Sequence, residues 1–387
     1  MSSRTIIHSA RLVSDGLETD DAWVLLGGGD DGSVEGRGTG DGWLTHAEDG
    51  RSDVVDAAGR FLVPGFIDLH VHGGGGASVD DGADAMRRVL ATHRLHGTTR
   101  SAISLVSAPL DELASRLSAV ADLASTDPTI LGAHLEGPFL SQDNRGAHDP
   151  AALIPPTPEA VALLLEAARG HLLQITIAPE LPGVLEAIRT LRAAGVIVAV
   201  GHTTGDADVA RAAFSAGATL LTHAFNAMPG IHHRHPGPIP VAIGNDDVVL
   251  ELIADGVHVS PPVLALAFAA APGHIALVTD AMAAADAPDG DYELGGLSVT
   301  VHEGVARLTG TDVIAGSTLT QDGALRTVLA AGVPMVEAVR ALTETPARVV
   351  GRSPELGSLA VGSAGDAVLL ADDLTVDAVW VAGERES

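Results

Sequence analysis

The 387-residue sequence contains no cysteine and no lysine. Without cysteine the chain can form no disulfide, no thiolate metal ligand and no cysteine nucleophile. All 22 residues counted as lysine or arginine are arginine. A Schiff-base amine, the lysine of a P-loop and a carboxylated lysine that bridges two metal ions are therefore excluded as well.

Aromatic residues, positive charge and long apolar runs are also scarce. Aromatics make up only 3% of the chain, so the core must be built from Ala, Val, Leu and Ile. The formal net charge of −28 argues against a nucleic-acid or anionic-membrane partner. No secretory signal pattern opens the sequence, and its most apolar stretch, 261–278, is interrupted by Pro272. We expect a soluble, cytoplasmic protein.

From residue 66 the sequence alternates between apolar strands and Ala/Leu-rich helices. Strands are predicted near residues 66–71, 98–105, 130–135, 172–178, 196–201, 218–224, 248–254 and 275–279. Helical patterns cover 84–96, 158–169, 181–194 and 206–216, among others. Eight strands joined by crossover segments predict an α/β fold, a (β/α)8 TIM-type barrel. A doubly wound open sheet is the alternative, but no GxGxxG follows the first strand.

The two chain ends carry a different pattern. Residues 1–60 alternate short strand-like runs with Gly/Asp-rich turns, including a loose, solvated segment near 28–42. Residues 367–382 are strand-like again. We expect 1–62 and 350–387 to form a small β-sandwich domain, and 63–349 to form the (β/α)8 barrel domain. Within the barrel domain, 292–308 resembles an inserted hairpin, and helices are expected near 317–331 and 335–343.

The sequence 61–76, FLVPGFIDLHVHGGGG, contains the first candidate site. Its second apolar run ends in His70 and His72, which are followed by four glycines. Residues i and i+2 of a strand point to the same side, so the two imidazoles are presented together beside a loop with little bulk. This arrangement favours a metal site over hydrogen-bonded core histidines.

Further polar residues end the other predicted strands. Barrel enzymes carry their chemistry at the carboxyl ends of the strands. The residues at those ends are His70, His72, Glu136, His202, His223 and Asp280. Imidazole and carboxylate ligands suit Zn, Fe, Mn or Co rather than Ca or Mg. Two neighbouring ions would need a bridging carboxylate, and Glu136 is the one ligand candidate placed for that role.

The motifs at these positions resemble a known family. HVH, HLEGPF, GHT, THAFNAMPG, ADGVH and TDAM together are similar to the amidohydrolase superfamily and, within it, to the N-acetylglucosamine-6-phosphate deacetylase family. The resemblance runs from about residue 60 to the end of the chain. HLEGPF and NAMPG are specific to that family, whereas HxH is shared by the whole superfamily. Relatives that bridge two metals with a carboxylated lysine are excluded in their usual form.

The resemblance implies roles residue by residue. Glu136, His202 and His223 match the principal metal ligands. His70 and His72 match a pair that holds a second ion in some members, which implies one or two divalent ions, with zinc favoured and Fe, Mn or Co open. Asp280 matches the catalytic acid/base, and His148 could polarise the amide oxygen.

The implied reaction is deacetylation of N-acetyl-D-glucosamine 6-phosphate to D-glucosamine 6-phosphate and acetate, in amino-sugar catabolism or cell-wall recycling. The residues expected to line the sugar site are Ala147, His148, Asn226, Ala227, Arg234, Asp255, His258, Val313, Ile314 and Ala315. Arg234, within IHHRHPG, matches an arginine that reaches the phosphate of the neighbouring subunit's ligand, which implies a homodimer.

Two alternatives remain open. The same fold could serve an amidase or deaminase that acts on another small amide or cyclic amidine, or a non-catalytic relative. Residues 140–150 could form a mobile lid or an ordinary ordered loop. The native metal, the number of ions and the tolerance for other N-acyl amino sugars are not fixed by the sequence.

Overall fold

A computed structural model describes residues 4–28, 32–47 and 52–386. The chain divides into two compact units, one comprising 1–67, 93–100 and 321–387, the other 68–92 and 101–320. In the part of the chain that is described, no helix is both long and apolar enough to cross a membrane.

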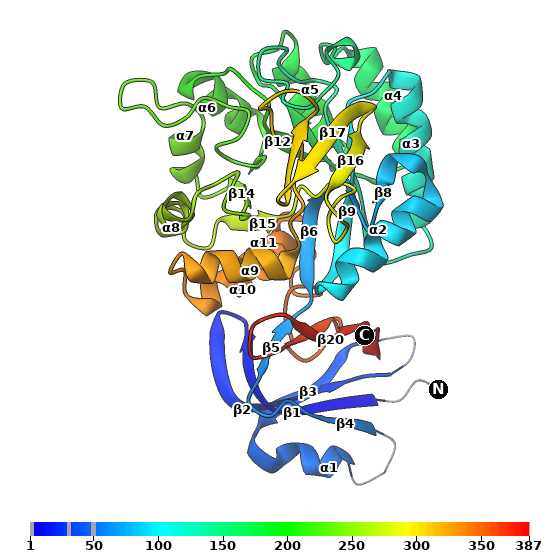
Figure 1. Cartoon of the computed structure of the whole chain (residues 1–387), viewed down its shortest axis with the longest axis vertical. Coiled ribbons are helices and arrows are strands. Elements are labelled where there is room, and N and C mark those ends of the chain that lie inside the picture. The colour runs from blue at the N-terminus through cyan, green and yellow to red at the C-terminus, as the bar shows by residue number, and fades with distance from the viewer. Residues whose placement is uncertain (1–3, 29–31, 48–51, 387) are drawn as a thin grey trace. The chain divides into compact units, whose positions relative to one another are not determined.

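One of two eight-stranded sheets is a parallel barrel (Figure 1). Its strands, in chain order, are β6 (Phe66–Val71), β9 (Thr98–Val106), β10 (Ile130–Glu136), β11 (Leu172–Ile177), β12 (Ile197–Val200), β13 (Leu220–Leu221), β14 (Val249–Ile253) and β15 (Ile275–Val278). Spatial order follows chain order from β6 to β15. The predicted barrel is confirmed, and the open-sheet alternative is wrong because the first and last strands meet.

A buried carboxylate helps to close the seam between β6 and β15. Val71 and Ala281 form a parallel bridge. Asp68 accepts a hydrogen bond from the Thr279 hydroxyl at 2.6 Å and from the Thr279 amide at 3.2 Å. Its burial raises the pKa of the Asp68 carboxyl to about 6, although the hydrogen bonds from Thr279 and the His70 amide counteract the rise. At the seam a side chain thus supplements the backbone bonds that join the other strands.

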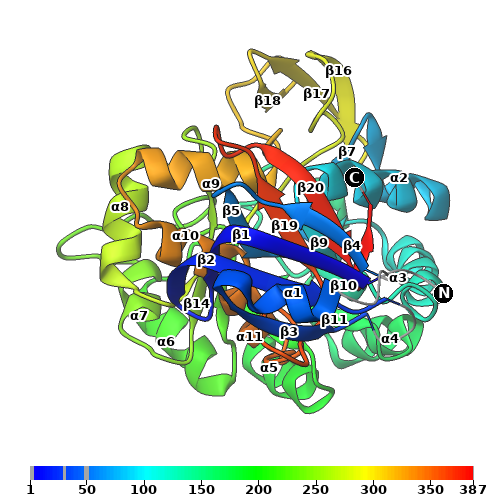
Figure 2. The ribbon, with the colours of Figure 1, turned by 90° about the horizontal axis from the view of Figure 1, so that it is seen from below.

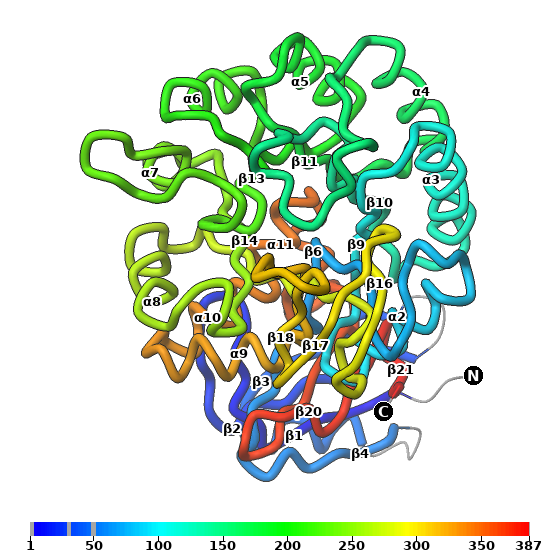
Figure 3. The backbone as a smooth tube through the Cα atoms, turned by 45° about the horizontal axis from the view of Figure 1, so that its top comes forward, coloured from blue at the N-terminus to red at the C-terminus, as the bar shows by residue number. Residues whose placement is uncertain are grey.

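Helices follow the strands around the outside of the ring (Figure 3). They are α2 (Ala83–Leu95), α3 (Leu110–Ala124), α4 (Pro158–Ala168), α5 (Val184–Ala193), α6 (Ala207–Ala216), α7 (Ile239–Ile243) and α8 (Pro261–Ala270). Side-chain caps mark the starts of α4 and α6: the Thr157 side chain accepts from the Ala160 amide, and Asp206 accepts from the amides of Asp208 and Val209. The predicted helical segments lie at these positions.

Short elements decorate the barrel. A two-stranded ribbon, β7 (Gly73–Gly74) and β8 (Ala77–Ser78), follows the first barrel strand, and 3-10 turns cover Val79–Asp81 and Pro150–Ala152. The predicted hairpin at 292–308 is a three-stranded antiparallel sheet of β16 (Gly290–Leu294), β17 (Leu297–His302) and β18 (Val305–Leu308). Leu294 and Val299 of this sheet share one buried apolar cluster with Val106 of β9.

The small domain is built from both chain ends, as predicted. Its sheet runs β21-β20-β19-β5-β1-β2-β3, with β4 on β1, and Figure 2 shows the C-terminal strands beside the N-terminal ones. The strands are β1 (Arg4–Ser14), β2 (Leu17–Leu26), β3 (Val34–Thr39), β4 (Ser52–Asp56), β5 (Phe61–Pro64), β19 (Ala367–Leu370), β20 (Val376–Val381) and β21 (Glu384–Arg385). A 3-10 turn (Gly40–Trp43) and the short helix α1 (Leu44–Ala47) follow β3. Residues of both ends, including Leu62 and Trp380, share one buried core.

The expectation of a loose segment near 28–42 is wrong for its middle part. Val34–Thr39 is strand β3, paired antiparallel with β2, and Val34 is buried. A Cβ at Gly36 or Gly38 would lie 3.2 or 2.9 Å from the ring of Trp23. These glycines therefore make room for an indole that lies across the strand. Residues 29–31 of the expected loop lie outside the described residues.

Three C-terminal helices belong to the same compact unit as the small sheet: α9 (Gln321–Ala330), α10 (Met335–Leu342) and α11 (Glu344–Val349). In this unit the Arg100 guanidinium makes two hydrogen bonds to the Asp366 carboxylate, at 2.6 and 3.0 Å, and both side chains are buried. The domain boundaries at 62/63 and 349/350 stay a prediction.

Candidate active site

Three of the candidate residues sit where the backbone leaves a barrel strand in a left-handed conformation. The φ angles are 46° at His202, 28° at His223 and 49° at Asp280. Such angles are uncommon for residues with a side chain and cost of order 1–3 kcal/mol each. The sharp turn explains why β13 comprises only Leu220–Leu221 although the apolar run extends to 224.

The Glu136 carboxylate, at the end of β10, lies at the centre of the cluster. Its Oε1 is 3.0 Å from Nε2 of His202 and 3.0 Å from Nε2 of His223. Its Oε2 is 3.2 Å from Nε2 of His72. Oε1 also lies 3.5 Å from Nε2 of His70. One carboxylate thus faces both groups of imidazoles, which is the geometry that a bridging ligand requires.

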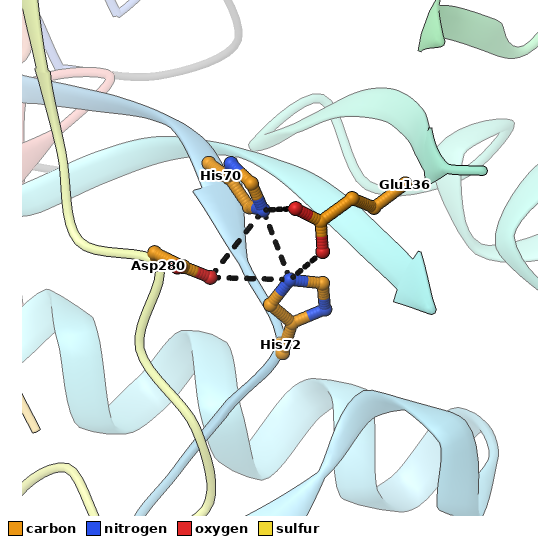
Figure 4. A group of neighbouring side chains, drawn as sticks. All are labelled: His70, His72, Glu136 and Asp280. Carbon is orange, nitrogen blue, oxygen red and sulfur yellow. Dashed lines mark hydrogen bonds and ion pairs between the residues drawn. The ribbon is translucent and has the colours of Figure 1, made fainter. Parts of the chain in front are cut away.

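The second group combines His70 of β6 and His72, which follows that strand, with Asp280 (Figure 4). Nε2 of His70 and Nε2 of His72 are 2.9 Å apart. Oδ1 of Asp280 lies 3.4 Å from the first and 3.3 Å from the second. His70, His72, Glu136 and Asp280 therefore offer four donor atoms within 4.8 Å of one another, and all four residues are buried.

Backbone carbonyls fix which nitrogen of two ligand histidines carries the proton. Nδ1 of His72 lies 2.8 Å from the Ser104 carbonyl, and Nδ1 of His202 lies 2.9 Å from the Asn144 carbonyl. Because a carbonyl only accepts, each Nδ1 donates, so either ring in its neutral form presents an Nε2 lone pair to the cluster. Converging lone pairs and carboxylate oxygens fit a divalent metal ion, and they repel one another without a cation or a proton between them.

His148 has the opposite arrangement. The Ser107 amide donates to Nδ1 of His148 at 3.4 Å, which leaves the proton of the neutral ring on Nε2. That Nε2 faces Oε2 of Glu136 at 3.3 Å. Burial lowers the pKa of His148, against the attraction of Glu136, which keeps the ring neutral. His148 therefore presents a hydrogen-bond donor rather than a metal-ligating lone pair.

The carboxylates and imidazoles shift each other's pKa strongly. Burial alone would lower the pKa of His72, but hydrogen bonds to Asp280 and Glu136 outweigh it and raise the value to about 9. Burial alone would raise the pKa of Asp280, but the nearby His70 and His72 lower it to about 2. The cluster thus holds Asp280 as a carboxylate that is available to accept a proton.

A cavity of about 390 Å³ opens beside the cluster. It is lined by seven of the ten predicted sugar-site residues, namely Ala147, His148, Asn226, Ala227, His258, Val313 and Ile314. His72, Glu136, His202, His223 and Asp280 line it as well. Arg234, Asp255 and Ala315 do not: Ala315 is buried, and Arg234 lies in the exposed loop 231–235.

Asp255 does not line the cavity itself but holds His258, which does. Its Oδ2 lies 2.6 Å from Nδ1 of His258, and its Oδ1 accepts from the amides of Val257 and His258, each at 2.8 Å. Burial opposes a charged His258, but the hydrogen bond to Asp255 raises the pKa of the ring above its ordinary value. The ring of His258 on the cavity wall therefore binds a proton more readily than a free imidazole does.

Several residues that sequence reasoning missed also shape the site. Val106, Asp143, Asn144, Leu294 and Asp312 line the cavity. Glu180 accepts from the hydroxyl of Thr203 and from the amide and hydroxyl of Thr204, and so holds the turn that follows His202. Glu251 stands out in the apolar run VVLELI and could have been noticed there.

A parallel barrel with imidazoles and carboxylates gathered at its strand ends defines the class of metal-dependent barrel hydrolases. A model of the amidohydrolase family matches residues 61–385. The chain belongs to the amidohydrolase family.

Individual relatives are more specific. N-acetylgalactosamine-6-phosphate deacetylase of Escherichia coli O157:H7 is 37% identical over 90% of this chain and 93% of its own length. N-acetylglucosamine-6-phosphate deacetylase of Vibrio furnissii is 35% identical over 86% of this chain and 84% of its own. A mutant of N-acetyl-D-glucosamine-6-phosphate deacetylase from Mycobacterium smegmatis, solved in complex with N-acetyl-D-glucosamine-6-phosphate, superposes with a TM-score of 0.92 at 38% identity and covers 99% of both chains.

Proposed function

We propose that this chain is a metal-dependent deacetylase that converts N-acetyl-D-glucosamine 6-phosphate into D-glucosamine 6-phosphate and acetate. The observation that carries the proposal is the convergence of a metal-ligand set, a carboxylate acceptor and a neutral imidazole donor on one cavity. The names of the relatives supply the substrate. No feature of the cavity favours the alternative of a cyclic amidine deaminase.

The metal ligands in this proposal are Glu136, His202 and His223, with His70 and His72 for a second ion. A bound divalent ion supplies Lewis acidity, which polarises a carbonyl and lowers the pKa of water from about 15.7 toward ~7. Zinc accepts this mixture of imidazole and carboxylate ligands and is the ion that we propose.

Two side chains perform the proton chemistry. The Asp280 carboxylate takes a proton from the attacking water as the new C–O bond forms at the acetyl carbon. It returns this proton to the amine nitrogen as the C–N bond breaks. Nε2–H of His148 donates a hydrogen bond to the amide oxygen and so stabilises the negative charge that develops there.

Loss of metal should abolish the reaction. We expect acetate release from N-acetyl-D-glucosamine 6-phosphate to fall to background after chelation and dialysis, and to return when Zn²⁺ is added. The galacto-epimer is assayed in parallel, because one relative is named for it. Turnover that survives complete metal removal would contradict the mechanism, and faster turnover of the epimer would reassign the substrate.

The substrate phosphate needs a cation, and we propose that Arg234 of a second subunit provides it in a homodimer. Arg234 lies on an exposed loop outside the cavity of its own chain, beside Ile231, whose side chain is 52% exposed. An exposed arginine next to an exposed apolar residue supports a subunit interface, because arginine is enriched at such interfaces. The planar guanidinium of the same arginine can donate two parallel hydrogen bonds to a phosphate. Phosphorylated sugars do not cross membranes unaided, so the proposal places the enzyme in the cytoplasm.

Replacing this arginine should weaken phosphate recognition selectively. We expect Arg234→Ala to raise KM for the phosphorylated sugar at least tenfold, consistent with the loss of a charged hydrogen bond of about 1.5–3 kcal/mol. KM for unphosphorylated N-acetylglucosamine should change little. Arg211→Ala, which removes another exposed arginine, is the control and should alter neither value. Equal effects of Arg234→Ala on both substrates would refute the assignment.

A further inference from the structure

A second carboxylate lies inside the barrel behind the metal-ligand cluster. Glu251 of β14 and Gln174 of β11 are both completely buried. Oε1 of Glu251 accepts a hydrogen bond from Nε2 of Gln174 at 2.9 Å. Oε2 of Glu251 lies 3.7 Å from Nδ1 of His70, and neither atom has another hydrogen-bond partner among the described residues.

The charge of Glu251 has little compensation nearby. The chain has no lysine, and within residues 4–28, 32–47 and 52–386 the one ion-pair partner of Glu251 is His70. A carboxylate that is removed from water costs several kcal/mol unless an opposite charge offsets it. A cation bound at Nε2 of His70, on the far side of the ring from Glu251, can offset this cost through the imidazole.

We propose that Glu251, held in place by Gln174, is a positioning residue that gives the His70/His72 position its affinity for a second divalent cation. The inference rests on the proposed metal centre and adds to it the residue that determines whether the second ion is retained. At 3.7 Å the contact with His70 is an ion-pair distance rather than a hydrogen bond. The carboxylate orients the Nδ1–H toward itself and leaves the Nε2 lone pair directed into the cluster.

The neighbouring ligands show why a carboxylate matters at this position. Nδ1 of His72 and Nδ1 of His202 donate to backbone carbonyls, which orient the rings but carry no net charge. A carboxylate behind a ligand histidine also raises the basicity of the ligating nitrogen. Of the ligand histidines, His70 is the one whose Nδ1 faces a side-chain carboxylate in the described structure.

The test is a titration of the metal-stripped full-length protein with Zn²⁺ alone. Calorimetry measures the affinity of each ion, and elemental analysis measures the number of ions bound. We expect the wild type to bind two ions per subunit. Glu251→Gln, which keeps the volume but removes the charge, should weaken the second ion about 10–100-fold and leave the tighter ion unchanged. If Glu251→Gln does not fold, Gln174→Leu decides: it should weaken the same ion in the same direction.

A matched control separates positioning from general disruption. Thr176→Val removes a fully buried hydroxyl of β11, the strand that also carries Gln174. This hydroxyl lies 2.9 Å from both His134 and Thr222. The variant should leave both affinities unchanged. An unaltered second ion in Glu251→Gln, equal weakening of both ions, or a wild type that binds one ion would each overturn the inference. Acetate release by the zinc-loaded wild type is measured in the same samples, so failure of the proposed function is seen independently.

Discussion

Asp280→Asn is expected to lower kcat by about 10²–10⁴ while the protein keeps its tighter metal ion. The amide retains the size and much of the hydrogen bonding of the carboxylate but cannot take a proton from water. Oδ1 of Asp280 lies 3.4 and 3.3 Å from the His70 and His72 nitrogens. The ligands His202 and His223 instead contact Glu136, each at 3.0 Å. The measurement is single-turnover acetate release together with elemental analysis of the same sample.

Asp312→Asn is the matched control for this variant. Asp312 also contributes a carboxylate to the cavity wall, but it is exposed and belongs to neither metal-ligand group. Its replacement should change kcat far less than tenfold. If Asp280→Asn retains more than about a tenth of the wild-type kcat, the proton-transfer role assigned to Asp280 is wrong.

Asp366→Ala is expected to destabilise the unit that contains the small sheet by about 3–5 kcal/mol, because it breaks the buried ion pair with the Arg100 guanidinium. The carboxylate also accepts a hydrogen bond from the Ala382 amide at 2.8 Å, and this bond is lost as well. All three tryptophans of the chain, Trp23, Trp43 and Trp380, belong to that unit. Tryptophan fluorescence during urea unfolding therefore monitors the affected part directly.

Two further variants define what the Asp366 result means. Arg211→Ala breaks an ion pair whose side chains are 61% and 88% exposed, so it should change the unfolding midpoint little. The double variant Arg100→Met/Asp366→Leu should be less destabilised than Asp366→Ala, because it replaces both members of the buried ion pair with apolar side chains. A single variant as stable as the wild type would show that the pair contributes no net stability.

The barrel could be predicted from the sequence because its strands are apolar runs with helical patterns between them. Local sequence was misleading where a distant side chain determines the conformation. Gly36 and Gly38 suggest a loop, yet they form a strand because the ring of Trp23 occupies the space that side chains would fill. The apolar run at 218–224 predicts a long strand, but the left-handed turn at His223 ends the pairing early.

The candidate site could be predicted to a similar extent. His70 and His72 follow from strand alternation, and Glu136, His202, His223 and Asp280 follow from the rule that parallel strands end on one face. The structure brings all six together. Asn144 could not be predicted because it acts through a backbone carbonyl, whose direction no residue type encodes. The contact of Glu251 depends on which barrel strands face each other across the interior.

The hydrogen bond between Asp68 and Thr279 also has a consequence for protein synthesis. It joins residues 211 positions apart in the chain. While the ribosome is still making the protein, β6 has no partner on its seam side until β15 has emerged. The backbone amide of Asp280 donates to the His70 carbonyl across that seam. His70 and His72 are therefore held in place only when the seam closes, although they are synthesised before Glu136, His202 and His223. We expect the first ion to be acquired by a partly synthesised barrel and the second only after translation has passed Asp280.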